Sequence, residues 1–225
     1  MYASKNADIK PNTVAFTSVA TAWSRSHNRD AVVKIKNLIQ WMKTLSKQGY
    51  KDVEPNQFTF NALLNAISRS DDDYKIEKAE QVLRDMENIY SVQANMFTYN
   101  AVLRCASSRG NNEQRRNVLR KAVVLFEKAL AQSNLEDSVN VTYGIFFTLC
   151  GNLIPKKSEK EEINRMLEAV FKRCCHDGNV DGMIINQFRN AASKSLYERS
   201  LKHIKNFPFI KVEDIPYDWR RNLKR

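Results

Sequence analysis

The sequence predicts an all-α protein in which stacked helix-turn-helix units form an α-α superhelix, or solenoid, that ends in a helical C-terminal cap. Three observations predict this fold class. The 225 residues include only 5 Pro and 6 Gly, too few for a β protein rich in tight turns. A similar phrase recurs along the chain, and the apolar residues within each copy follow the spacing of an α-helix.

The recurring phrase has three clear copies and a weaker fourth. They read PNTVAFTSVATAWSRS from Pro11, PNQFTFNALLNAISRS from Pro55, ANMFTYNAVLRCASSRG from Ala94 and SVNVTYGIFFTLCG from Ser138, with starts separated by 44, 39 and 44 residues. Within each copy the apolar residues fall at i, i+3, i+4 and i+7, which is one face of a helix. These first-helix residues are Phe16, Val19, Ala20, Trp23; Phe60, Leu63, Leu64, Ile67; Tyr99, Val102, Leu103, Ala106; and Tyr143, Phe146, Phe147, Cys150.

A second helix with the same spacing is expected after each first helix. Its apolar residues are Ile35, Leu38, Ile39, Met42; Ala79, Val82, Leu83, Met86; Ala122, Leu125, Phe126, Ala129; and Ile163, Met166, Leu167, Val170. A single helix pair cannot bury such a face alone, so neighbouring pairs must stack, and we expect these side chains to form the core.

The spacing divides the chain into a repeat array and a cap. Residues 1–12 resemble the tail of an upstream repeat, so we expect either that the chain is a fragment of a longer array or that its start codon is mis-set. Residues 13–175 hold units at about 13–56, 57–95, 96–139 and 140–175. In residues 176–225 we expect short helices over 180–192 and 195–205, and a basic tail from Phe207 that wraps the last helices.

Charge and cysteine content restrict the function classes. The formal net charge of +11 favours a polyanionic partner, either nucleic acid or an anionic membrane surface. The chain lacks the run of ~18 to 20 apolar residues that a membrane span requires. Four cysteines without a CxxC pair indicate a reducing compartment.

Two phrases carry a family resemblance. FTFNALL (58–64) and FTYNAVL (97–103) resemble the first-helix signature of pentatricopeptide repeats, and VEPN (53–56) and IKPN (9–12) resemble the turn that closes those repeats. The resemblance covers roughly residues 1–175. Tetratricopeptide repeats, the main competing family, carry a WxxLGxxY phrase that none of the four copies shows.

The resemblance implies that the chain binds single-stranded RNA, one base per repeat. In that family a base is read by a polar residue early in the first helix together with the last residue of the repeat, and an apolar residue packs on it. Carried over, the reading pairs are Thr17 with Asn56, Asn61 with Asn95, and Asn100 with Val139; the packing residues are Val14, Phe58 and Phe97, followed by Val141. The first pair implies adenine and the second a pyrimidine.

Two departures limit this assignment, and one alternative competes with it. Val139 cannot hydrogen-bond through its side chain, and Gly144 leaves the fourth unit without its first polar group. Asn12, Asn56 and Asn95 could equally be helix N-caps, whereas Asn61 and Asn100 lie a turn further in, where Asn is a mediocre helix former.

Other functions have weaker support in the sequence. His27, His176 and His203 are not spaced as metal ligands, and we expect neither a catalytic site nor a cofactor. Cys174 and Cys175 are expected to be a buried thiol pair, and Asp71–Asp73 a solvated turn rather than a cation site.

The serious alternative to RNA binding is a protein-binding scaffold. Residues 199–225 carry 8 Lys or Arg against 3 Asp or Glu, which favours RNA. The resemblance further implies a role in organellar RNA processing, stability or translation, in a mitochondrion or plastid, with other RNA-processing proteins as further partners.

Overall fold

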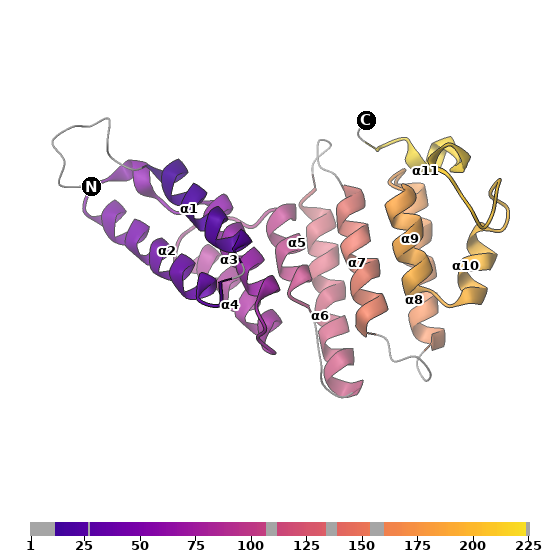
Figure 1. The fold of residues 1–225 in the computed structure, drawn as a ribbon, viewed down its shortest axis with the longest axis horizontal. Helices are drawn as coiled ribbons and strands as arrows, with labels where there is room; N and C mark the ends of the chain where they lie inside the picture. Colours follow the sequence, from indigo (N-terminus) through magenta and orange to yellow (C-terminus); the bar gives the residue numbers. More distant parts are fainter. Residues whose placement is uncertain (1–11, 27, 107–111, 134–138, 154–159, 224–225) are drawn as a thin grey trace. The chain divides into compact units, whose positions relative to one another are not determined.

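The computed structural model describes residues 12–26, 28–106, 112–133, 139–153 and 160–223 (Figure 1). Over these ranges the chain forms eleven α-helices that pack in adjacent pairs, with no strand. The all-helical repeat fold predicted from the sequence is thereby confirmed. The predicted upstream tail lies outside the described residues except for Asn12. The chain divides into two compact units, Met1–Cys105 and Ala106–Arg225, which are described in turn.

The N-terminal unit consists of two helix pairs and a further first helix. Its helices are α1 (Thr13–Arg25), α2 (Ala31–Lys47), α3 (Gln57–Arg69), α4 (Lys75–Asn88) and α5 (Met96–Arg104), with a 3-10 turn at Lys51–Val53. Helix α1 pairs with α2 and α3 with α4, while α3 lies between α1 and α5 (Figure 1). The three first helices of this unit therefore stand side by side.

An asparagine starts each of these first helices. The Oδ1 atoms of Asn12, Asn56 and Asn95 accept hydrogen bonds from the backbone N–H three residues later, at 3.0, 3.1 and 3.0 Å. At Asn56 and Asn95 a threonine at the third helical position completes a capping box. Because a cap satisfies N–H groups that the helix itself leaves unpaired, the repeated asparagine sets the start of each first helix.

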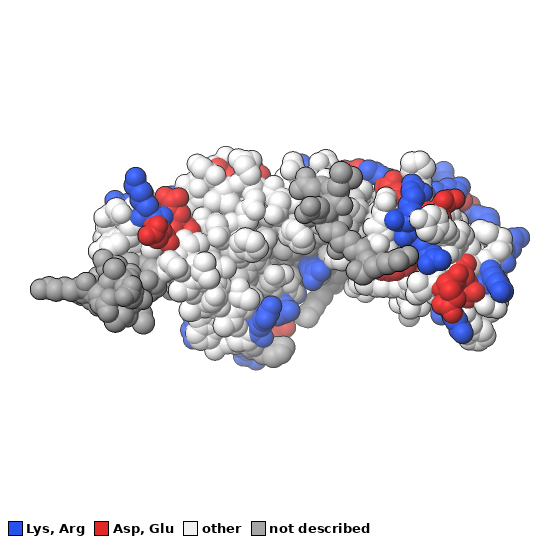
Figure 2. All heavy atoms as spheres, turned by 90° about the horizontal axis from the view of Figure 1, so that it is seen from above, with Lys and Arg blue, Asp and Glu red and all other residues white. Residues whose placement is uncertain are grey.

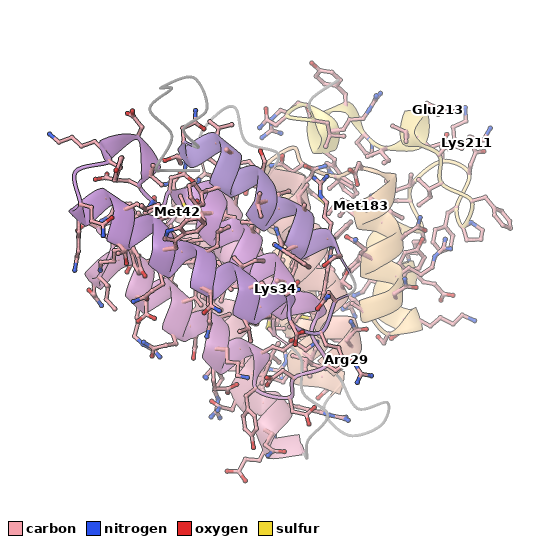
Figure 3. All side chains as sticks on the ribbon, turned by 60° about the vertical axis from the view of Figure 1, so that its left-hand side comes forward. Arg29, Lys34, Met42, Met183, Lys211 and Glu213 are labelled. Atoms are coloured by element: carbon pink, nitrogen blue, oxygen red, sulfur yellow. The ribbon has the colours of Figure 1, made fainter. Side chains whose placement is uncertain are left out.

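The apolar faces predicted from the sequence form the core of this unit. Met42 is 0% exposed and packs with Phe16, Leu45 and Val53 between the helices of the first pair (Figure 3). Val19 departs from the prediction because it is 47% exposed, and Trp23, Leu38 and Leu83 are only half-buried. Among the described residues, α1 packs against α2, α3 and the 3-10 turn at Lys51–Val53.

The C-terminal unit repeats this packing with further helices. It contains α6 (Asn112–Ala131), α7 (Val139–Leu153), α8 (Lys160–His176), α9 (Gly182–Ala191), α10 (Lys194–Leu201) and α11 (Tyr217–Arg220), with a 3-10 turn at Val212–Asp214. Helix α7 packs along α9 as α1 packs along α3, and α10 contacts both α8 and α9 (Figure 1). Helices were predicted at 180–192 and 195–205, close to α9 and α10.

Aromatic side chains fill the core of the C-terminal unit. The rings of Phe126 and Phe146 lie 4.4 Å apart between α6 and α7, and those of Phe171 and Phe188 stack at 4.1 Å between α8 and α9. Such ring pairs contribute free energy beyond their buried area. A third ring pair, Phe147 and Phe188 at 5.5 Å, joins α7 to α9.

The tail turns back onto the last helices, as predicted. The backbone N–H of Val180 donates to the carbonyl of Trp219 at 2.7 Å, and that of Asn222 donates to Gly178 at 2.9 Å. The Trp219 ring meets Phe171 edge-on at 5.9 Å. Gly178 has a φ of +68°, which permits the turn between α8 and α9 that the tail covers.

Candidate nucleic-acid interface

The three packing residues predicted from the sequence occupy equivalent positions on three helices, and all three are exposed. Val14, Phe58 and Phe97 each lie two residues after a capping asparagine, on the first turn of α1, α3 and α5. They are 70%, 69% and 54% exposed, although neighbouring apolar residues of the same helices are buried. Because these exposed apolar side chains occupy the same position on adjacent helices, they form a candidate contact surface for a ligand.

The predicted first reading residues come five positions after the same caps. Thr17 is half-buried, and its hydroxyl lies 3.1 Å from that of Thr59 on the adjacent helix α3. Asn61 is half-buried too, and its Oδ1 atom is buried with no hydrogen-bond partner among the described residues. Asn100 is 4% exposed. A buried carboxamide oxygen without a partner costs about 1 to 3 kcal/mol, so Asn61 carries a hydrogen-bonding capacity that the fold leaves unused.

The predicted second reading residues are helix caps. Asn56 Oδ1 accepts from the N–H and the hydroxyl of Thr59, at 3.1 Å each. Asn95 Oδ1 does the same with Thr98, and its Nδ2 donates to Gln57 Oε1 at 3.1 Å. The capping role, left open by the sequence, is therefore present, and any contact of Asn95 with a base competes with these bonds.

The fourth unit has a glycine at the position where the other three carry a predicted reading residue. Val139 is the first residue of α7, Val141 is half-buried, and Gly144 is buried. Val139, the predicted partner of Asn100, belongs to the other compact unit.

Helix α9 has the register of a first helix, which the sequence analysis missed. Asp181 caps it, with Oδ1 accepting from the N–H of Ile184 at 2.7 Å. Met183, two residues after the cap, is 40% exposed (Figure 3), and Asn186, five residues after it, is exposed. The signal was available in the sequence, because Ile185 and Phe188 follow Asp181 by four and seven residues, as Phe60 and Leu63 follow Asn56.

In each unit a side-chain hydrogen bond joins the cap of one first helix to a residue at the start of the preceding first helix. Asn95 Nδ2, at the cap of α5, donates to Oε1 of Gln57 on α3 at 3.1 Å, whereas Asn140 Nδ2 on α7 donates to Oδ2 of Asp181, the cap of α9, at 2.9 Å. Equivalent positions of α7 and α9 therefore make the contact seen between α3 and α5. This equivalence supports treating α9 as the first helix of a further unit.

Positive charge is plentiful in the C-terminal unit. Lys and Arg side chains gather there, with Asp and Glu among them, on the face seen in Figure 2. Some of the arginines are engaged: Arg199 pairs with Glu168 at 2.7 Å, and Arg173 Nη1 contacts both carboxylate oxygens of Glu127 at 3.0 and 2.9 Å. Exposed pairs of this kind contribute little to stability, and phosphate groups can compete for them.

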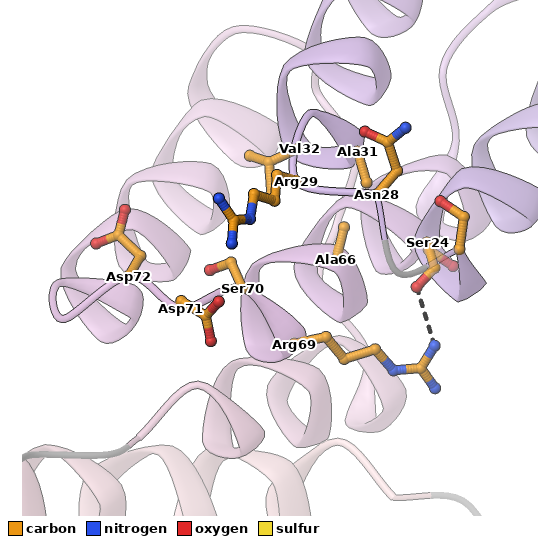
Figure 4. A pocket seen from close by; sticks show the side chains of 11 residues that line it. Ser24, Asn28, Arg29, Ala31, Val32, Ala66, Arg69, Ser70, Asp71 and Asp72 are labelled. Atoms are coloured by element: carbon orange, nitrogen blue, oxygen red, sulfur yellow. Dashed lines mark hydrogen bonds between the residues drawn. The ribbon is translucent and has the colours of Figure 1, made fainter.

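A polar hollow of about 760 Å³ lies at the opposite end of α1 and α3 from their caps (Figure 4). Arg29, Asp71 and Asp72 line it. Arg69 also lines it, and its Nη1 donates a hydrogen bond to the carbonyl of Ser24 at 2.9 Å. Asp72 pairs with Lys78, whose hydrogen bond holds the pKa of that carboxyl below its usual range. Two of the lining side chains, those of Arg69 and Asp72, therefore already have partners within the fold.

The cysteines are poor candidates for chemistry. All four are free and buried, as predicted for Cys174 and Cys175. Burial raises the pKa of the Cys105, Cys150 and Cys175 thiols from 9.0 to about 12, and raises that of Cys174 as well. Because the thiolate is the reactive form, these thiols are weak nucleophiles at neutral pH.

Two properties of the described residues concern metal binding and membranes. The described residues contain no group of three or more His, Cys, Asp or Glu side chains that could hold a metal ion; His27 lies outside them. No helix within the same ranges is long and apolar enough to cross a bilayer.

Comparison with known protein families finds a match in the N-terminal part of the chain. Residues 3–70 match the family model described as pentatricopeptide repeat domain, which spans α1, α2 and α3 of the described residues. No curated protein and no solved structure matches the chain.

Proposed function

We propose that this chain, which carries a pentatricopeptide repeat domain in residues 3–70, binds single-stranded RNA in a sequence-specific manner. Proteins of this family generally bind RNA and are typically not catalytic. The finer proposal is that the bound RNA is an organellar transcript, in a mitochondrion or plastid, whose processing, stability or translation the protein supports.

One observation carries the proposal: the shared register of the three first helices in the N-terminal unit. Each presents a cap, an exposed apolar side chain two residues later and a polar side chain five residues later. Bases of a single strand can stack against Val14, Phe58 and Phe97, since every base has an apolar face. The unused carboxamide oxygen of Asn61 can accept from a base edge, and its amide nitrogen can donate.

The register of α9 extends the same proposal to the C-terminal unit. Met183 takes the packing position and Asn186 the reading position of a fifth unit, beyond the four predicted from the sequence. In a duplex the base faces and edges are already engaged, so we expect the chain to prefer single strands.

The test is the base preference of the full chain, selected from a pool of randomised single-stranded RNA. Asn61→Thr is expected to change the preference at one position from pyrimidine toward adenine, because Thr stands at the reading position of the first unit, for which the family resemblance implies adenine. Asn65→Thr, one turn further along α3, is the matched control and should leave every position unchanged.

Two results would contradict the proposal in different ways. An unchanged preference in Asn61→Thr would remove the base-reading assignment. Absence of RNA binding by the unmodified chain, even at low salt where phosphate contacts are strongest, would favour a protein-binding scaffold.

A further inference from the structure

Gly144 and Gln187 lie against each other in the C-terminal unit. Gly144 takes the position of α7 at which α1, α3 and α5 carry Thr17, Asn61 and Asn100. A Cβ atom added to Gly144 would overlap Gln187 Oε1, and would lie 3.2 Å from Gln187 Cδ and 3.3 Å from Met183 Cε. The space that a reading side chain of α7 would fill is therefore occupied by the carboxamide of a residue on α9.

The residues that correspond to Gln187 in the N-terminal unit are small. Gln187 comes six residues after the cap of α9, and the same position holds Ala62 in α3 and Ala101 in α5, both 4% exposed. In the N-terminal unit a polar residue on one first helix thus precedes an alanine on the next. In the C-terminal unit a glycine precedes a glutamine.

The two arrangements contain the same atoms. Asn61 with Ala101 and Gly144 with Gln187 have equal side-chain composition, with the carboxamide attached to the earlier helix in one pair and to the later helix in the other. The carboxamides share a second property. Asn61 Oδ1 and Gln187 Oε1 are both buried without a hydrogen-bond partner among the described residues. Buried polar atoms are normally paired, so each of these oxygens is an acceptor left unused by the fold.

Met183 places this group beside the predicted path of the RNA. It is the exposed apolar residue two positions after the cap of α9, and its Cε atom approaches the same side of Gly144 as the Gln187 carboxamide. The half-buried Gln187 side chain therefore lies next to the residue on which a base would pack.

We propose that Gln187 reads the base of the fourth unit in place of Gly144, by reaching over it from α9. This inference rests on the proposed RNA binding and adds a specificity-determining residue to it. The fourth unit is then a reader whose polar group comes from the neighbouring repeat. Because a glutamine carboxamide both donates and accepts, it can complement a base edge as an asparagine does.

Three variants separate base reading from packing. Gln187→Leu keeps the bulk over Gly144 but cannot hydrogen-bond. Gln187→Ala leaves the space empty. The exchange Gly144→Asn with Gln187→Ala returns the carboxamide to α7, with the same atoms in the arrangement of the N-terminal unit.

The measurement is the base frequency at each position after selection from randomised single-stranded RNA, with the full chain. Gln187→Leu and Gln187→Ala should each lower the preference at one position by about 3- to 10-fold, the effect of one hydrogen bond, and leave the position set by Asn61 intact. The exchange variant should restore a preference at that position.

The outcomes distinguish this inference from the function on which it rests. Unchanged base frequencies in Gln187→Leu, with a shift in Asn61→Thr, would overturn the role of Gln187 alone and leave it as a packing residue. Lack of RNA binding by the unmodified chain would overturn both. Should Gln187→Leu fail to fold, the exchange variant decides, because a preference absent there contradicts the inference.

Discussion

Two phenylalanines, two positions apart on α3, show how differently neighbouring residues of one helix are used. Phe60 is 2% exposed and its ring meets that of Tyr90 edge-on at 5.0 Å, whereas Phe58 is 69% exposed. The first belongs to the core, and the second has no such role in the fold. Substituting each by alanine therefore separates stability from binding.

Phe60→Ala should lower the free energy of unfolding by about 3 to 5 kcal/mol, because it opens a cavity in the core. Phe58→Ala should change that free energy by less than about 0.5 kcal/mol, as exposed positions do. It should nevertheless weaken binding to single-stranded RNA by about 1 to 3 kcal/mol, the contribution of one stacked base. Urea unfolding and RNA titration measure the two effects. Equal RNA affinities for Phe58→Ala and the unmodified chain would contradict the assignment of Phe58.

The apolar faces of the helices could be predicted from the sequence because burial repeats with the period of the helix. Phe60, Leu64 and Ile67 are each buried as predicted. The roles of Asn56 and Asn95 could not be separated in this way. A cap and the last reading residue occupy the same position, and both roles favour the same side chain.

At the scale of the helix, the Asn95 side chain makes three hydrogen bonds, two with Thr98 and one with Gln57. Asn95→Ala loses them all and should lower the free energy of unfolding by about 1 kcal/mol. Asn95→Ser keeps a capping oxygen and should cost only a few tenths of that, although it loses the bond to Gln57.

The same pair of variants tests whether Asn95 also reads a base. Both remove the carboxamide, so both should change base preference at the position shared with Asn61, while only Asn95→Ala destabilises the helix. If Asn95→Ser leaves base preference as it was, Asn95 is a cap and nothing more.

Helix α9 could be predicted from the sequence as a helix, but not as the first helix of a repeat unit. The sequence predicts a short helix of the C-terminal cap domain there, because the recurring phrase is not recognisable in this segment. Its packing along α7 depends on Phe147 and Phe188, whose rings lie 5.5 Å apart and whose contact joins residues distant in sequence. Likewise, Gly144 could be read from the sequence only as a missing side chain, because the residue that covers it lies on another helix.

At the scale of the whole molecule, buried thiol and phenol groups should make the free energy of unfolding depend on pH in the alkaline range. Burial raises the pKa of Cys105, Cys150 and Cys175 from 9.0 to about 12 in the folded chain. Burial and the hydrogen bond to Asp177 raise the pKa of Tyr143 too. The unfolded chain therefore releases protons at lower pH than the folded chain.

The free energy of unfolding should be constant with respect to these groups below pH 9.0 and should fall as the pH rises toward about 12. Denaturant titrations at a series of pH values measure this dependence. Replacing Cys150 by Ala should reduce the slope, since one buried thiol is removed. A slope that stays flat to pH 12 would show that these thiols are not held protonated by the fold.

The central claim is that RNA lies along the exposed starts of the first helices, and photocrosslinking locates RNA directly. We predict that uridine-rich single-stranded RNA bound to the full chain and irradiated will crosslink to the peptides that hold Phe58 and Phe97. Phe58→Ala should remove the first of these crosslinks and keep the second. Crosslinks confined to residues 199–225, or to the outer faces of α2 and α4, would contradict the account, because the RNA would then be held by charge away from the reading residues.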